Sequence, residues 1–130
     1  FVVKGVKSLE RKARNQGWAE YSSERVYLRG YCVSPGVFFG SGAYVHAFFR
    51  LHKGDVDDVV QWSFRQRVKL RVVHPEGGGE REFVEGPSVL LRSYQRPREG
   101  EVDGIFISYE SFYLDDLVRD GYVESDQLRL

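Results

Sequence analysis

Residues 64–73 carry the feature that most constrains the fold. Basic side chains at odd positions alternate with mostly apolar side chains at even positions: Arg65, Arg67, Lys69 and Arg71 against Gln66, Val68, Leu70 and Val72. A period of two sends the two sets to opposite faces of a β-strand, since successive strand side chains point in opposite directions. Residues 77–79 are three glycines that suit a hairpin tip, and 81–84 is the expected return strand. The chain is therefore expected to build an antiparallel sheet.

Further strands are predicted along the chain. Their segments are short and apolar: 1–6, 25–31, 37–39, 43–52, 105–107 and 127–130. Valine is plentiful, alanine is scarce and aromatic residues reach 15%, a balance that favours strands over a helical bundle. Many short strands with Gly/Pro turns and one late helix predict an antiparallel β-sandwich.

Three segments are expected to lie outside strands. Residues 7–18 are polar and predict a loop or a short helical turn. Residues 34–36, Ser-Pro-Gly, predict a turn, since proline fixes φ and glycine permits positive φ. Residues 110–120 predict a short helix, with Ser108 able to cap its start and Gly121 able to end it.

Length, charge and composition narrow the class of protein. The 130 residues suit a single domain over 1–130, and the absence of methionine, even at position 1, suggests a piece of a longer multi-domain protein. The zero net charge argues against a general nucleic-acid binder. A lone cysteine, Cys32, excludes an intrachain disulfide framework, and no apolar run is long enough to suggest a membrane span. We therefore expect an intracellular protein with no nucleic-acid or membrane partner.

Charge is divided unevenly between the two halves. Residues 1–65 carry +4 and residues 66–130 carry −4. Either the chain ends attract each other in the fold, or the asymmetry steers a charged partner. The basic row at 65–71 has two readings as well: a solvated strand face partly neutralised by Glu80 and Glu82, or a docking face for acidic groups.

The residues that could do chemistry are scattered along the chain: Cys32, His46, His52, His74 and the pairs Asp57–Asp58 and Asp115–Asp116. The histidines lack metal-ligand spacing, although His46 and His52, six residues apart, should share one strand face. Adjacent carboxylates point apart and do not make an acid–base pair. No enzyme, metal or cofactor is expected.

Several motifs resemble the MATH domain, in particular the C-terminal domain of tumour-necrosis-factor-receptor-associated factors (TRAF proteins). The stretch 59–70, Val-Val-Gln-Trp-Ser-Phe followed by a basic alternating strand, is similar to a family signature. Residues 94–97, Tyr-Gln-Arg-Pro, are similar to the family's Phe-Gln-Arg-Pro, and 47–49 followed by Lys53-Gly54 matches the preceding strand. The resemblance covers residues 27–130, while the first 26 fit loosely. It implies an eight-stranded antiparallel sandwich with one short helix near the C-terminus.

Such domains bind short extended peptides along a sheet edge, so the resemblance also implies site residues. Carried over by position, they are Phe38, Phe48, Leu70, Arg92, Ser93, Tyr94 and Gly104. The family's arginine is lost near Gly36, and Ser93 alone remains of a serine cluster. Pro35 implies a strand edge or a bulge there. The apolar members, Phe38, Phe48 and Leu70, could equally be core residues.

The resemblance implies a non-catalytic adaptor in the cytoplasm that docks short linear motifs of receptor tails or signalling adaptors. A homotrimer would depend on a flanking coiled coil. One alternative is a substrate-recognition MATH domain of a ubiquitin-ligase adaptor. Another is an accessory domain of a meprin-like protease, which the lone cysteine and the lack of an Asn-x-Ser/Thr site disfavour.

Overall fold

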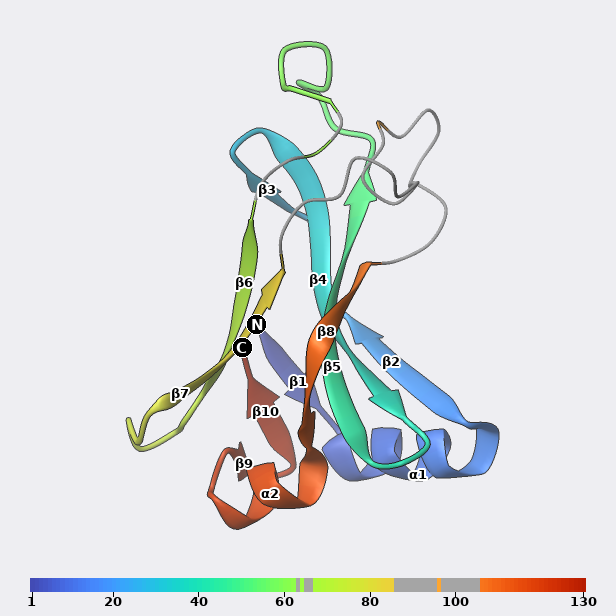
Figure 1. Ribbon diagram of the computed structural model, residues 1–130, viewed down its shortest axis with the longest axis vertical. Helices are drawn as coiled ribbons and strands as arrows, with labels where there is room; N and C mark the ends of the chain where they lie inside the picture. The colour runs from blue at the N-terminus through green and yellow to red at the C-terminus, as the bar shows by residue number, and fades with distance from the viewer. Residues whose placement is uncertain (63, 65–66, 86–95, 97–105) are drawn as a thin grey trace.

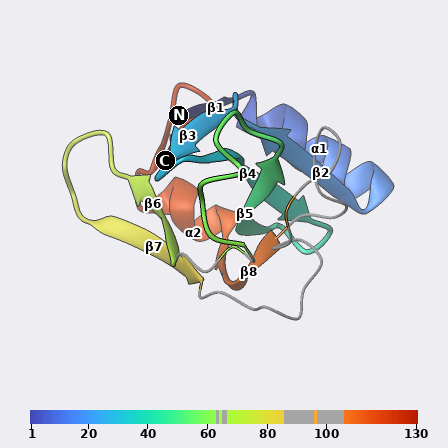
Figure 2. The ribbon, with the colours of Figure 1, turned by 90° about the horizontal axis from the view of Figure 1, so that it is seen from above.

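A computed structural model of the chain describes residues 1–62, 64, 67–85, 96 and 106–130 (Figure 1). Within this part, two antiparallel sheets pack as a β-sandwich, and both helices lie at one end of it. Seen from above, β6 and β7 lie on one side and β2, β4 and β5 on the other (Figure 2). The predicted sandwich is confirmed.

Sheet A has the strand order β1-β10-β6-β7, with β9 also paired to β10. Its strands are β1 (Val2–Lys4), β6 (Val68–Val73), β7 (Glu80–Glu85), β9 (Val123–Glu124) and β10 (Gln127–Arg129). Because β1 pairs with β10, the two ends of the chain meet: the Phe1 amino group donates to the Leu130 carbonyl at 2.7 Å. The β6–β7 hairpin forms as predicted, with Gly77 and Gly79 at positive φ in its tip.

Sheet B has the order β2-β4-β5-β8, and β3 pairs with β4 beyond the end of β2. Its strands are β2 (Trp18–Ser22), β3 (Val26–Leu28), β4 (Tyr31–Gly40), β5 (Tyr44–His52) and β8 (Phe106–Tyr113). The described residues thus form ten strands where eight were expected, because β3 and β9 are short additional pairings.

The core fills the space between the two sheets in two clusters. The larger cluster joins both sheets to the helices and includes Val37, Phe39, Val72, Leu117 and Leu128. The smaller cluster lies at the opposite ends of β4 and β5, where Tyr31, Val33, Phe49, Leu51 and Phe64 pack together. Odd-numbered residues of β4 and β5 supply both clusters, so the even-numbered ones face outward.

Helix α1 (Val6–Gln16) occupies the segment expected to be a loop or a short turn. Val6, Leu9 and Ala13 form its apolar stripe and pack on the larger core cluster. Asp126, at the opposite end of the sequence, caps the helix: its side chain accepts from the Lys7 N–H at 2.8 Å. Gly17 ends the helix at φ 96° and donates to the Ala13 carbonyl.

Strand β4 runs straight through the predicted Ser34–Gly36 turn. β4 has strand neighbours on both sides, but neither β2 nor β3 pairs with Pro35, so at this residue β4 is locally an edge, as expected. The Pro35 carbonyl accepts from the Ser23 N–H at 2.8 Å, so its nitrogen also points to the side where β2 ends and β3 has not yet begun. The missing proline N–H therefore falls in the gap between β2 and β3, where the ladder requires no donor from this residue.

Helix α2 (Leu114–Arg119) is shorter than the helix predicted over 110–120. Strand β8 takes the first residues of that segment, because Phe112 and Tyr113 pair with Val45 and Tyr44 of β5. The predicted Ser108 cap is consequently wrong, since this residue lies within β8. The helix ends at Gly121 as predicted, with φ 86°.

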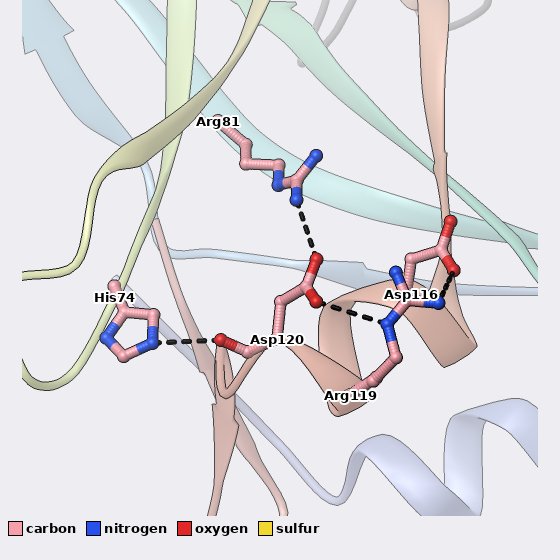
Figure 3. Close-up of polar contacts among 5 residues, drawn as sticks. All are labelled: His74, Arg81, Asp116, Arg119 and Asp120. Atoms are coloured by element: carbon pink, nitrogen blue, oxygen red, sulfur yellow. Dashed lines mark hydrogen bonds and ion pairs between the residues drawn. The ribbon is translucent and has the colours of Figure 1, made fainter.

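A polar network fastens α2 to the β6–β7 hairpin (Figure 3). Arg81 of β7 donates to the Asp120 carboxylate at 2.7 Å, and His74 Nε2 donates to the Asp120 carbonyl at 3.0 Å. The Arg81 guanidinium also lies over the rings of Phe112 and Tyr122. The network holds sheet A to the end of β8, which fixes the relative position of the two sheets at this end.

Candidate functional site

The outward-facing surface of sheet B carries two of the residues that the resemblance implies for peptide binding. Phe38 of β4 and Phe48 of β5 are both even-numbered, so they point away from the core. The even spacing of His46 and His52 also places these histidines on this surface, as expected. We call this surface the outer face.

A row of side chains crosses the outer face through all four main strands. Trp18 of β2 stacks on Phe38 with ring centroids 6.2 Å apart and planes 5° apart. Phe38 in turn meets His46 edge-on at 6.4 Å, and His46 is paired with Ser111 of β8. Trp18 is 47% exposed and the other three are half-buried. The row therefore offers an accessible, largely aromatic surface, which sequence reasoning missed because Trp18 lies outside the resembling segment.

Two tyrosines extend the aromatic surface next to this row. Tyr44 and Tyr113 are paired across β5 and β8, with ring centroids 5.3 Å apart, and both are exposed. The negative charge of Asp115, together with its hydrogen bond, raises the pKa of Tyr113 above its usual value. At neutral pH the Tyr113 phenol is protonated, and its hydroxyl is hydrogen-bonded to Asp115.

Phe48 is buried although it faces outward. Its ring lies against the α-carbon of Gly36, so that a Cβ at this glycine would sit 2.5 Å from Phe48 Cζ. The Arg50 guanidinium lies 5.5 Å from the ring centroid and pairs with Glu20 of β2 at 3.7 Å. Only 1% of Phe48 is exposed, so its role here is to support the outer face from beneath.

Leu70 lies apart from Phe38 and Phe48. It belongs to β6 of sheet A, where it is half-buried, packs on the core and lines a cavity between the sheets. The structure thus brings Phe38 and Phe48 to one face and places Leu70 on the other sheet. The remaining implied residues lie outside the described part of the chain: Arg92, Ser93, Tyr94 and Gly104.

A buried hydrogen bond lies at the far end of the outer face. Ser34 Oγ and His52 Nε2 are 2.7 Å apart, and the two residues are only 3% and 5% exposed. A serine next to a histidine is the arrangement of an activated nucleophile, but a nucleophile must reach substrate. Burial on this scale identifies a structural contact between β4 and β5.

The tryptophan motif also serves the fold. Trp62 Nε1 donates to the Asp57 carbonyl at 2.8 Å, and its ring meets Tyr31 edge-on at 5.3 Å. Asp57 accepts from the Gly54 N–H at 2.9 Å, which closes the turn after β5. These contacts give a structural reason for the tryptophan in the motif at residues 59–70: Trp62 connects the loop after β5 to the start of β4.

Within the part of the chain that the structure describes, no three histidine, cysteine or carboxylate side chains are placed to hold a metal ion. No described helix is both long and apolar enough to span a bilayer. Cys32 is a buried free thiol.

Comparison with known proteins decides the family. The family model "TRAF/meprin, MATH domain" matches residues 22–130. The chain belongs to this family. The match confirms the resemblance and begins close to where the sequence motifs become recognisable. MATH domains are protein-interaction domains and are typically non-catalytic.

A solved structure shows the same fold. The chain is similar to TRAF5 of Notothenia coriiceps, with a TM-score of 0.83 and 20% sequence identity over all of this chain and 72% of that one. At this identity the likeness concerns the fold of the MATH domain. A search of curated proteins found no significant match.

Proposed function

We propose that this MATH domain is a non-catalytic docking module that binds short linear motifs of receptor tails or signalling adaptors in the cytoplasm. It would bring them to a signalling assembly or a ubiquitin ligase whose catalytic parts lie in other chains or domains. A trimer formed through a flanking coiled coil would raise the avidity for clustered receptor tails.

The observation that carries this proposal is the row Trp18, Phe38, His46 and Ser111, which ends at strand β8. Within the described residues β8 pairs with β5 alone, so no described strand occupies its other edge. An extended peptide can add to such an edge through main-chain hydrogen bonds, and alternate side chains then reach the neighbouring surface. Aromatic rings suit this role, because they present large apolar area with little conformational entropy to lose.

Peptide binding to the outer face can be tested with one anchor residue and one matched control. A peptide array of receptor-tail and adaptor motifs supplies the ligand, and fluorescence polarisation measures its affinity. Phe38→Ala should weaken binding by about tenfold or more, as expected when an aromatic anchor is truncated. Val59→Ala removes an apolar side chain that is 81% exposed in the loop after β5, and should leave the affinity unchanged.

Thermal unfolding shows whether Phe38→Ala remains folded. If the folded variant binds as tightly as the wild type, the outer face is not the docking surface. Arg92→Glu tests a position that the resemblance assigns to the family's serine cluster, where the arginine of this chain would contact an acidic peptide, and should weaken binding of acidic peptides. Cleavage of the peptides by the purified domain would contradict the non-catalytic part of the proposal.

A further inference from the structure

The tyrosine pair of the outer face is open to a ligand. Tyr44 and Tyr113 are 49% and 39% exposed, and their rings are tilted by 55° with centroids 5.3 Å apart. Neither ring belongs to the two core clusters, so packing of the interior does not account for them. The faces of aromatic rings carry negative electrostatic potential, which makes two accessible rings an attractive surface for a cation.

Gly40 keeps the surface beside Tyr44 clear of side chains. It is paired with Trp18 of β2, and β4 lies between β2 and β5, so the glycine lies between the exposed indole and Tyr44. Apart from its chain neighbours, a Cβ built on Gly40 would have one atom within 4 Å, the Tyr44 carbonyl oxygen at 3.9 Å. A peptide side chain can therefore lie over Gly40 and contact rings on either side of it.

The charges next to the tyrosine pair are negative. The exposed carboxylate of Asp115 accepts a hydrogen bond from the Tyr113 hydroxyl, and its charge, with that of Asp116, raises the pKa of Tyr113. Asp116 is paired with Arg119 at 3.0 Å. In contrast, no basic side chain in the described ranges forms an ion pair with Asp115. One unneutralised carboxylate therefore lies beside two accessible rings.

The Asp115 carboxylate has room for a second donor. A carboxylate offers two oxygens and about four lone pairs, of which the Tyr113 hydroxyl uses one. This hydroxyl is uncharged, so its hydrogen bond leaves the negative charge in place. A cation bound here would gain a charge-assisted hydrogen bond to the carboxylate and attraction to the ring faces at the same time.

We propose that the peptide docked on the outer face carries an arginine whose guanidinium lies against Tyr44 and Tyr113 and pairs with Asp115. This inference rests on the proposed docking function and adds the chemistry of one peptide position. Arginine fits better than lysine, because its flat guanidinium stacks on a ring while its N–H groups reach a carboxylate. A glutamate at this position would be repelled by Asp115, so acidic residues of the peptide would occupy other positions.

The test uses three fluorescein-labelled peptides that differ at one position. They are Thr-Val-Thr-Arg-Thr-Val-Thr and the same sequence with citrulline or glutamate in place of arginine. Citrulline keeps the shape of arginine but is neutral, so it isolates the effect of the charge. In fluorescence polarisation, the wild-type domain should bind the citrulline peptide at least about fivefold more weakly than the arginine peptide, and the glutamate peptide more weakly still.

Two variants locate the effect of the charge. Asp115→Asn should remove most of the difference between the arginine and citrulline peptides, because the amide keeps the size of the carboxylate but not its charge. Tyr44→Leu should weaken binding of the arginine peptide more than binding of the citrulline peptide. The control Glu124→Gln makes the same charge change at an exposed residue of β9, on the other sheet, and should leave all three affinities unchanged.

The arginine proposal and the docking function fail in different ways. The arginine proposal is overturned if the arginine peptide does not bind, if the citrulline peptide binds as tightly, or if Asp115→Asn leaves the ratio of the two affinities unchanged. It is also overturned if sedimentation shows a wild-type dimer that Asp115→Asn separates, since a second copy of this chain would then cover the site. Equal binding of the two peptides that still depends on Phe38 would refute the arginine alone and leave the docking function standing.

Discussion

Replacement of Gly36 by alanine tests how closely β2, β4 and β5 pack beneath the outer face. A Cβ at this position would lie 2.2 Å from the Tyr21 carbonyl oxygen and 2.5 Å from Phe48 Cζ. The phenyl ring has some freedom to move, but the carbonyl belongs to the β2–β4 ladder, where Ser22 is paired with Gly36. To restore ordinary contact, the two strands would have to separate by about 1 Å, as overpacking of a tight interior requires.

We expect Gly36→Ala to lower the free energy of unfolding by about 2–4 kcal/mol, from about 1–3 kcal/mol of overpacking and about 1 kcal/mol for a weakened ladder hydrogen bond. For a domain of this length the midpoint of thermal unfolding should fall by about 10 °C. Urea unfolding followed by circular dichroism gives the free energy, and a thermal scan gives the midpoint.

Gly40→Ala is the matched control on the same strand. The nearest atom to its added Cβ is the Tyr44 carbonyl oxygen at 3.9 Å, an ordinary contact. This variant should be as stable as the wild type or up to about 1 kcal/mol more stable, because alanine restricts the unfolded chain. If Gly36→Ala and Gly40→Ala have equal stability, the reasoning about the packing around Gly36 is refuted.

Two further predictions concern ion pairs. Arg81→Ala should lower the free energy of unfolding by about 1–2 kcal/mol, since it removes a short charge-assisted bond to Asp120 and contacts with two rings. Arg119 is 69% exposed, so Arg119→Ala should lower it by less than about 0.5 kcal/mol. Equal urea midpoints for the two variants would contradict this reasoning. The hydrogen bond and charge of Arg96 hold the pKa of Asp58 below its ordinary 3.8. The contribution of this ion pair to stability is therefore complete above pH 3.8 and is lost as the pH falls through the folded-state pKa. Carboxyl NMR titration should show the Asp58 pKa rising toward 3.8 in Arg96→Ala, and an unchanged pKa would exclude the pairing.

Local sequence patterns predicted the parts of the fold in which local preference and tertiary packing agree. The β6–β7 hairpin follows from strict alternation and a glycine tip, and β5 follows from its apolar run. Helix α1 was missed because its stripe has only three apolar residues, Val6, Leu9 and Ala13, among many charged ones. Its cap comes from Asp126, which no local pattern can reveal.

The errors at β4 and β8 have the same physical origin. Ser34-Pro35-Gly36 has the chemistry of a turn, but Pro35 fits a strand because the ladder has a gap on its nitrogen side. Residues 110–113 have the spacing of a helix, but pairing of Phe112 and Tyr113 with β5 keeps them extended. In both segments tertiary pairing overrides local preference.

The candidate site was only partly visible in the sequence. The resemblance named Phe38 and Phe48 as peptide-binding residues, but it did not predict that Phe48 is buried, with its ring against Gly36 and next to Arg50. Exposure and unpaired edges are properties of the assembled sheets, so periodicity alone does not predict them.

The two tryptophan indole N–H signals offer the most direct test of peptide docking on the outer face. Trp18 is half-exposed in the aromatic row, whereas the Trp62 indole donates to the Asp57 carbonyl on a different part of the domain. In a proton–nitrogen NMR titration with a peptide selected from the array, the Trp18 indole signal should shift and the Trp62 signal should stay in place. A bound peptide that leaves the Trp18 signal unmoved would contradict the account.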